Sequence, residues 1–461
     1  MDLGFETIGN ATLVCHDKKP ILVTDPWLVG TAYFGSWGRS HEIPPETLDA
    51  VTNCEFVWLS HGHPDHLSPP SLELVQGKKF LLPDHVGGRI FEGLKDRGFN
   101  VTVMRDRRWY RLSDRIRVLS IADYNQDAIL LVNVGDNLIA NLNDASDRGW
   151  GGDVRRAVTK SRVSFLLQQP KGTGDAEMIN LWREDGTFIE PKATTRMPIG
   201  RLLAGQSKEF GTTFCVPFSS MHRFQRADCM WAQKYRIKLS DYPMGFESRT
   251  TELLPAFTRY DVTRDLAEPL NPQPNNSAPA EPGDFGDDWS EPLESTDAVK
   301  ITKYFKAISH LETFLDFIRI RVGGIEHVVE LARRRFDRGL TFEAPRNSLM
   351  IAVDNEIFDD LLNANFMKTT IHGQEERLLS GPDFIPYVTK YADNGLAKSK
   401  KELDAYFKEY MMRTPLAFLK HRIEKRSTNF LRFSLKENSH LFRLGVRTYF
   451  WAKGRGFPKR A

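Results

Sequence analysis

The sequence has few cysteines and no long apolar run, and both absences exclude classes of protein. Only four of the 461 residues are cysteine, and no two have the CxxC spacing typical of thiolate zinc sites. No hydrophobic stretch approaches the roughly 18 residues that a membrane-spanning helix needs. The N-terminus has no basic segment followed by an apolar one, so we expect no signal peptide. These absences favour a cytoplasmic globular protein with reduced thiols.

An overall excess of one charge is also lacking, because 63 Lys and Arg residues nearly balance 60 Asp and Glu residues. The charges are nevertheless spread unevenly. Residues 413–461 contain 13 basic and two acidic residues, interleaved with aromatic ones, so the rest of the chain is net acidic. This basic C-terminus predicts contact with an anionic ligand or surface, or else a packed helix with a solvated basic face.

The length of the chain exceeds that of one ordinary core and predicts two domains. Residues 1–265 show alternating short strands and helices, which indicates an α/β domain. Residues 266–298 are rich in Pro, Asn, Ser and acidic residues, and we interpret them as a linker or a long surface loop. Residues 299–461 are predicted to form a mainly helical domain.

The helical prediction for the C-terminal domain depends on the spacing of its apolar residues. Residues 302–322 and 325–336 both show apolar positions near a period of 3.6. Residues 348–355 are predicted to form a strand instead, which leaves an α+β domain open as the alternative.

Local signals place several elements in the first domain. Residues 44–51 predict a short helix, and residues 55–60 predict an apolar strand that ends directly before His61. Ser68, followed by two prolines, predicts the start of another helix. Two strands are expected to meet across Gly135-Asp136-Asn137, a typical hairpin turn.

The strongest chemical signal is a cluster of four metal-ligand side chains within six residues: His61, His63, Asp65 and His66. Imidazole and carboxylate are the usual ligands of Zn, Fe and Mn. On an extended or turning segment, His61 and His63 can point at one metal, while Asp65 and His66 face a second. The cluster therefore predicts a metal centre at the end of a buried strand.

The cluster resembles the HxHxDH signature of the metallo-β-lactamase superfamily. Its surroundings are similar to the catalytic region of the CMP-N-acetylneuraminate hydroxylase family, and more broadly to ascorbate-phosphate lactonase-like proteins. The matching segments are Asp25-Pro26-Trp27-Leu28, Gly35-Ser36-Trp37, His41-Glu42-Ile43-Pro44-Pro45 and His66-Leu67-Ser68. The resemblance covers about residues 5–225, and it implies a four-layer αββα sandwich.

The resemblance also implies two divalent metal ions (Fe, Zn or Mn) and further ligands for them. Asp144 lies where the superfamily has a metal-bridging aspartate, and His222 lies where it has the last histidine of the second metal. The sequence departs from the pattern before Asp144, because no histidine is present there. We expect Asp123 to replace that histidine, with Asn125 and Asp127 as the alternatives. A carboxylate would make the site harder and favour iron or manganese over zinc.

Two further residues receive roles from their positions in the family pattern. Asp25 is expected to orient a ligand histidine rather than to bind metal itself. His41 is a candidate substrate contact or proton donor, and we count it with Asp65 as a candidate catalytic residue.

Three functions follow from this interpretation. The favoured one is a dinuclear hydrolase of a small anionic metabolite, such as a lactone, a phosphoester or a sugar or nucleotide conjugate. The alternative is an iron-dependent oxygenase like the hydroxylases. Those enzymes also carry a Rieske module held by two Cys and two His, a pattern that these four cysteines do not form, so a separate reductase or ferredoxin would have to supply electrons. The third is a non-catalytic binding module stabilised by metal.

Overall fold

The computed structural model describes residues 1–170, 178–191, 198–332, 337–373, 384–388 and 396–423. Most of the basic C-terminus, and with it the predicted anionic contact, lies outside these residues. Among the helices within the described ranges, none has the length and apolar character that crossing a bilayer requires.

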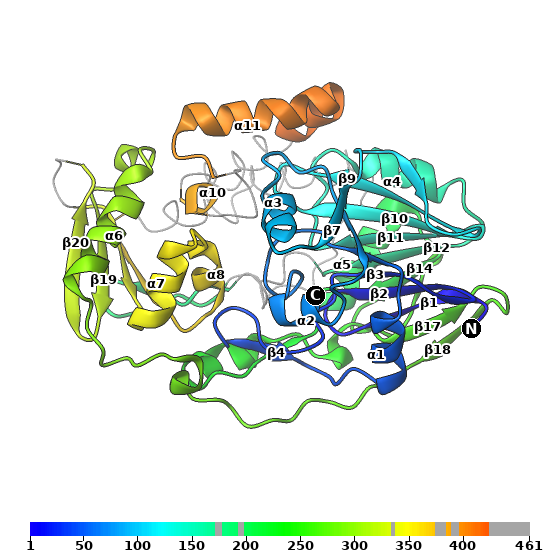
Figure 1. Cartoon of the computed structure of the whole chain (residues 1–461), viewed down its shortest axis with the longest axis horizontal. Helices are drawn as coiled ribbons and strands as arrows, with labels where there is room; N and C mark the ends of the chain where they lie inside the picture. Colours follow the sequence, from blue (N-terminus) through cyan, green and yellow to red (C-terminus); the bar gives the residue numbers. More distant parts are fainter. Residues whose placement is uncertain (171–177, 192–197, 333–336, 374–383, 389–395, 424–461) are drawn as a thin grey trace, which may run out of the picture.

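Two large sheets form the N-terminal part of the molecule (Figure 1). The first contains β1 (Leu3–Ile8), β2 (Thr12–Asp17), β3 (Lys19–Thr24), β5 (Phe56–Trp58), β6 (Lys79–Leu82), β7 (Asn100–Val103), β17 (Thr258–Asp261) and β18 (Leu266–Pro269), in the order β18-β17-β1-β2-β3-β5-β6-β7. The second contains β8 (Trp109–Arg111), β9 (Ile116–Ala122), β10 (Ala128–Val134), β11 (Asn137–Asn143), β12 (Ser164–Gln168), β14 (Phe214–Pro217) and β16 (Glu252–Leu253), in the order β16-β14-β12-β11-β10-β9-β8. The predicted hairpin joins β10 and β11, and Gly135 in its turn has a φ of 60°.

The sheets pack face to face with helices on both outer surfaces. Phe5 and Trp58 of the first sheet share a buried core with Leu130 and Phe165 of the second. The outer face of the first sheet is covered by α1 (Pro45–Thr52), α2 (Pro69–Glu73) and α3 (Arg89–Asp96). The outer face of the second is covered by α4 (Gly151–Val158) and α5 (Ile199–Phe210). The predicted αββα sandwich is therefore confirmed, as are the helix at residues 44–51 and the strand before His61.

The carboxyl ends of parallel strands meet at one edge of this sandwich. In the first sheet β3 and β5 run parallel, so Asp25 after β3 and His61 after β5 lie at the same end. In the second sheet β11, β12 and β14 run parallel, which brings Asp144 and Ser219 to that edge as well. Such edges are where α/β proteins place their binding groups.

A third sheet dominates the C-terminal part. It contains β13 (Leu181–Arg183), β19 (Phe317–Val322), β20 (Ile325–Glu330), β21 (Gly339–Glu343) and β22 (Lys368–His372), in the order β13-β22-β21-β19-β20. The helices of this part are α6 (Ser295–Ala307), α7 (Arg346–Asp354), α8 (Phe358–Asn363), α10 (Ile385–Val388) and α11 (Lys400–Arg413). The region thus has the α+β character that the sequence left open. Its β13 comes from the N-terminal part, between β12 and β14, and pairs with β22.

Three local predictions in this region need correction. The helix expected over residues 302–322 ends at Ala307, and residues 317–322 form β19. Of the helix expected over residues 325–336, residues 325–330 form strand β20 instead, and residues 333–336 lie outside the described residues. In this edge strand Ile325 is 60% exposed, so the apolar pattern does not mark a buried helical face. The strand expected over residues 348–355 is helix α7, because a short apolar run cannot by itself separate a strand from a buried helix.

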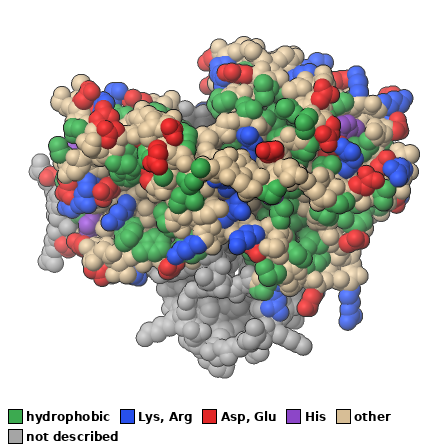
Figure 2. Space-filling view, turned by 90° about the horizontal axis from the view of Figure 1, so that it is seen from below, with side chains coloured by type: hydrophobic (Ala, Val, Ile, Leu, Met, Phe, Trp, Pro, Cys, Tyr) green, Lys and Arg blue, Asp and Glu red, His purple; other side chains and the backbone are tan. Residues whose placement is uncertain are grey.

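The segment that joins the two parts is anchored to both. Asp287 contacts buried Arg226 at 2.6 Å and accepts the backbone N–H of Ser348 at 2.9 Å. Around the third sheet the buried core continues into the segment that carries Tyr33 and Trp37. The C-terminal part therefore packs directly on the edge where the strand ends meet. On the molecular face shown in Figure 2, acidic and basic side chains are interspersed with hydrophobic ones.

Among the described residues, β4 (Trp37–Arg39) and β15 (His222–Phe224) also form a small antiparallel pair in which His222 lies opposite Arg39. This pair fixes one of the predicted metal ligands beside a buried tryptophan.

Candidate metal centre

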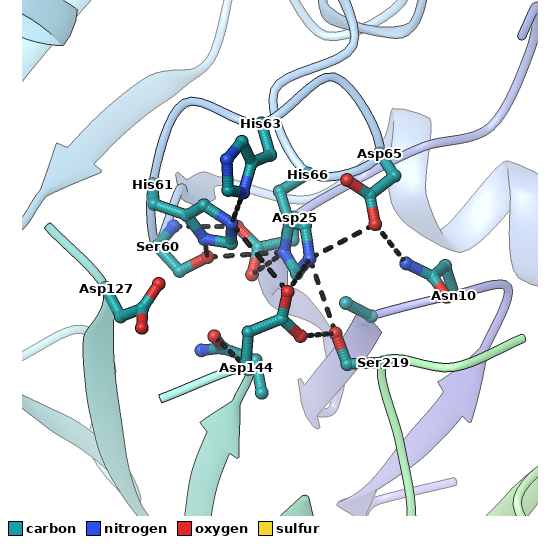
Figure 3. A network of polar contacts seen from close by, with 12 residues as sticks. Asn10, Asp25, Ser60, His61, His63, Asp65, His66, Asp127, Asp144 and Ser219 are labelled. Carbon is teal, nitrogen blue, oxygen red and sulfur yellow. Dashed lines mark hydrogen bonds and ion pairs between the residues drawn. The ribbon is translucent and has the colours of Figure 1, made fainter. Parts of the chain in front are cut away.

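The loop that carries the histidine cluster follows β5 and turns back at once. The backbone N–H groups of His66 and Leu67 both donate to the carbonyl of His63, at 3.0 and 2.8 Å. This turn gathers the rings of His61, His63 and His66 into one group (Figure 3). His61 and His66 are fully buried, and Asp65 is nearly so. The cluster is therefore a built internal site and not a solvated polar loop.

Two imidazole nitrogens face each other in the first part of the site. Nε2 of His61 lies 2.9 Å from Nδ1 of His63 and 3.8 Å from Oδ2 of Asp144. Burial, with the neighbouring His66 and His63, lowers the pKa of His61 well below its ordinary value. Because neutral imidazole is the form that binds metal, His61 is suited to act as a ligand at neutral pH.

In the second part of the site, His66 lies among three carboxylates. Its Nε2 is 3.5 Å from Oδ2 of Asp65 and 3.3 Å from Oδ2 of Asp144, and its Nδ1 is 3.2 Å from Oδ2 of Asp25. Burial alone would raise the pKa of Asp144, but His66 and His61 outweigh it and lower that pKa to about 2. An ionised carboxylate therefore lies between His61 and His66, and ligand atoms of these three residues are within 4.8 Å of one another.

An irregularity at the end of β11 directs Asp144 into this position. The register of β11 with β12 shifts between Asn141 and Asn143, and Asn143 has a φ of 37°. The side chain of Asn143 holds the bend, since its Oδ1 accepts the N–H of Asp144 at 2.6 Å and its Nδ2 donates to the carbonyl of Ala128 at 2.9 Å. Bulges commonly re-aim a side chain beside a functional site in this way.

His222 is buried, and its ring stacks on Trp37 with centroids 3.8 Å apart. Neither ring nitrogen has a hydrogen-bond partner among the described residues. Burial and nearby Arg236 lower the pKa of His222 to about 3, so the ring is neutral. A buried polar group without a partner needs an explanation, and a metal ion that accepts one of these nitrogens supplies one. On this ground the residues present fit the metal that the sequence predicts.

Asp123 lies among other partners. Its Oδ2 accepts from Nη1 of Arg148 at 3.1 Å and from Nε1 of Trp150 at 3.3 Å, and its Oδ1 accepts the N–H of Asn125 at 2.8 Å. The same Nη1 of Arg148 donates to Asp127 at 3.0 Å. Burial raises the pKa of Asp123 to about 6 despite Arg148. These contacts occupy the carboxylate of Asp123, and its role as a ligand stays a prediction, as do those of Asn125 and Asp127.

Of the two residues with predicted supporting roles, Asp25 contacts the histidine cluster and His41 lies apart from it. Asp25 touches His66, and its Oδ1 accepts the backbone N–H of Ser60 at 2.7 Å, as expected of a carboxylate that orients a ligand histidine. His41 is half-buried, with Nδ1 2.8 Å from the hydroxyl of Ser40 and its ring against Phe257. Its described contacts do not reach the histidine cluster, so its catalytic role also stays a prediction.

Several residues at the site carried no sequence signal of their own. Asp65 accepts hydrogen bonds from Asn10 Nδ2 at 2.9 Å and from the hydroxyl of Tyr33 at 2.8 Å. Asn10 belongs to Gly9-Asn10-Ala11-Thr12, a segment that shares in the family resemblance but does not by itself indicate this contact. From the C-terminal part, Asp359 and Asp360 of α8 lie beside His63. Some 300 residues separate them from His63 in the sequence, so only the fold brings them together.

No family model matches the sequence, but individual relatives do. The chain is 29% identical over 163 residues to the cytidine monophosphate-N-acetylneuraminic acid hydroxylase of Asterias rubens, and 31% identical over 158 residues to that of Danio rerio. The matches cover 33% and 32% of this chain. They span 25% and 27% of those proteins, so the similarity is confined to about a quarter of the relatives' length.

Solved structures with similar folds include hydrolases and a hydroxylase. The isothiocyanate hydrolase from Delia radicum gut bacteria superimposes with a TM-score of 0.37 at 15% identity, covering 56% of this chain and 98% of that one. CmlA, a diiron β-hydroxylase from Streptomyces venezuelae, superimposes with a TM-score of 0.35 at 12% identity, covering 57% and 54%. By its αββα sandwich, its histidine loop and its sequence relatives, this chain is a metallo-β-lactamase-fold protein, similar over about a third of its length to the cytidine monophosphate-N-acetylneuraminic acid hydroxylases.

Proposed function

We propose that the chain is a metal-dependent hydrolase of a small anionic metabolite, such as a lactone, a phosphoester or a sugar or nucleotide conjugate. The observation that carries this proposal is the position of Asp144, whose Oδ2 lies 3.8 Å from Nε2 of His61 and 3.3 Å from Nε2 of His66. One carboxylate between two histidine groups suits a ligand shared by two ions.

The residues divide into two ligand sets around Asp144. His61 and His63 would hold one ion, with Asp123 as the predicted third ligand, while Asp65, His66 and His222 would hold the other. When bound, two divalent ions lower the pKa of a shared water and polarise the carbonyl or phosphoryl group under attack. The chain orients its ligands through Asp25 on His66 and through Tyr33 and Asn10 on Asp65. A ligand set fixed in advance keeps reacting groups in place without reorganisation.

A half-buried cation beside this site favours an anionic substrate. Nη1 of Arg236 donates to the carbonyl of His222 at 3.4 Å. Burial is the main cause that lowers the pKa of His222 and of His41, and the positive charge of Arg236 lowers both further. A fixed positive charge near the centre attracts and orients a carboxylate or phosphate group.

The second candidate is an iron-dependent oxygenase that takes electrons from a separate reductase or ferredoxin. The similarity to the hydroxylases of Asterias rubens and Danio rerio favours it. A carboxylate-rich ligand set also suits iron better than a set of histidines alone.

The test begins with protein purified without air and without added metal. Zinc or manganese without a visible absorption band, with hydrolysis of lactones or phosphoesters, supports the hydrolase. About two irons per chain with a ferric band supports the oxygenase. Absence of metal, also after reconstitution, contradicts both functions.

Two variants connect any activity to the site. His61→Ala and Asp144→Ala should each lose bound metal and hydrolysis together. His327→Ala provides the matched control, because His327 lies on β20 and contacts Thr302 at 2.8 Å. Activity that survives in Asp144→Ala would contradict the proposed role of the centre.

A further inference from the structure

The C-terminal part reaches the candidate metal centre through helix α8. Oδ2 of Asp359 lies 3.5 Å from Nε2 of His63, and ligand-type atoms of His63, Asp359 and Asp360 are within 4.8 Å of one another. The contact is sheltered, because the side chains of His63 and Asp359 are only 17% and 9% exposed.

The other oxygen of Asp359 is buried and has no hydrogen-bond partner among the described residues. A buried carboxylate normally has its oxygens hydrogen-bonded or paired with a cation, because desolvation of an unpaired charge is costly. Of the described contacts, the one with Nε2 of His63 is the ion pair available to Asp359. This pair offsets part of the cost of burying the carboxylate of Asp359.

Packing holds Asp359 firmly in place. The preceding residue, Phe358, is fully buried, with its ring centroid 4.9 Å from that of Phe342 and 5.3 Å from that of Phe305. Leu361 and Leu362 on the same helix lie in the same core. A carboxylate on such an element is fixed relative to the ring that it contacts.

The two nitrogens of His63 therefore have different surroundings. Nδ1 faces Nε2 of His61 at 2.9 Å, on the side of the predicted metal, whereas Nε2 faces Asp359. A histidine that binds metal through Nδ1 carries its proton on Nε2, and a carboxylate that accepts this proton fixes the tautomer and the ring orientation.

We propose that Asp359 is a positioning residue of the metal centre, which orients His63 so that its Nδ1 is free to bind metal. The inference rests on the proposed function, because it assumes that His63 is a ligand. It assigns a role to the C-terminal part: helix α8 completes the support of the metal centre from outside the αββα sandwich.

The test measures metal affinity and not activity. Metal-free wild type, Asp359→Ala and Asp359→Asn are titrated with Zn²⁺ against a chromophoric chelator, and the visible spectrum of each is recorded with Co²⁺. Asp359→Ala should bind Zn²⁺ about 10- to 100-fold more weakly in one of the two steps, as is typical for loss of such a partner. Its Co²⁺ spectrum should change. Asp359→Asn, which keeps an acceptor oxygen but loses the charge, should fall between the two.

Asp354→Ala is the matched control, because Asp354 ends the neighbouring helix α7, is 46% exposed and pairs with Lys300 at 2.9 Å. It should match wild type in affinity and spectrum. If Asp359→Ala does not fold, as judged by its circular dichroism, Asp359→Asn decides the question alone. Wild-type affinity and spectrum in the deciding variant overturn the inference. A wild-type protein that binds neither Zn²⁺ nor Co²⁺ overturns the proposed function itself.

Discussion

Asp25 links the histidine loop to the end of β3, because its Oδ2 lies 3.2 Å from Nδ1 of His66 while its Oδ1 accepts the N–H of Ser60 at 2.7 Å. One side chain thus fixes both a ligand ring and the start of the loop that carries it. We expect Asp25→Ala to weaken Zn²⁺ binding by about 10- to 100-fold, measured by chelator competition. Asp316→Ala, which removes a buried acid directly before β19, should leave the affinity unchanged. Equal weakening in both variants would show a general loss of stability instead.

The contacts of Asp123 predict how its substitution changes the stability of the folded chain. Asp123→Asn keeps the side-chain shape but removes the charge that Arg148 and Trp150 contact. Since Asp127 still pairs with Arg148, the free energy of unfolding should fall by about 1–3 kcal/mol, less than for a fully broken buried pair. Urea unfolding of the metal-free protein measures this fall. Metal analysis of the same variant tests the ligand prediction, because a normal metal content would remove Asp123 from the ligand set.

His222 should make the metal-free protein sensitive to acid. The pKa of its ring is about 3 in the folded chain and about 6.5 in an unfolded one. Between these values the unfolded state binds the extra proton, so stability falls as the pH falls, by up to about 1.4 kcal/mol per pH unit. Urea unfolding at several pH values should therefore give a flatter profile for His222→Gln than for wild type below about pH 6.5. Parallel profiles would contradict this account.

Asn365 connects the C-terminal part to the loops around the centre. It accepts from Nε1 of Trp37 through its side chain at 3.4 Å and from Nε1 of Trp231 through its carbonyl at 2.8 Å. Its Nδ2 donates to the carbonyl of Met178 at 2.5 Å. Asn365→Ala should lower the free energy of unfolding by about 1–3 kcal/mol, because buried polar groups lose their partners. Because the φ of Asn365 is 69°, Asn365→Gly separates backbone strain from lost hydrogen bonds in the same unfolding assay.

Local patterns predicted several elements around the histidine loop correctly, while the sandwich was implied by the resemblance to the superfamily. The strand before His61, the turn at Gly135 and the helix after Pro44 depend on neighbouring residues, and the structure contains all three. Edge strand β20 and helix α7 were predicted wrongly, because short apolar stretches acquire their conformation from the core that they join.

The support around the candidate site was harder to predict. The contacts of Tyr33 with Asp65 and of Asp359 with His63 join segments 32 and nearly 300 residues apart. A single Tyr or Asp has no spacing pattern that reveals such a partner. Ligand-type residues that are close in sequence are therefore predictable, while the residues that orient them depend on the fold.

The path of β13 limits how the chain can be divided. This strand lies in sequence between two strands of the second sheet, yet it pairs in parallel with β22 of the third. The polypeptide thus crosses from the sandwich to the third sheet and back before it crosses again through the anchored segment. Cutting or recombining the gene between the sandwich and α6 would leave β13 with an unpaired edge and remove Asp359 from His63. The sandwich and the third sheet are therefore expected to fold as one unit, and neither is expected to be stable when the two are expressed apart.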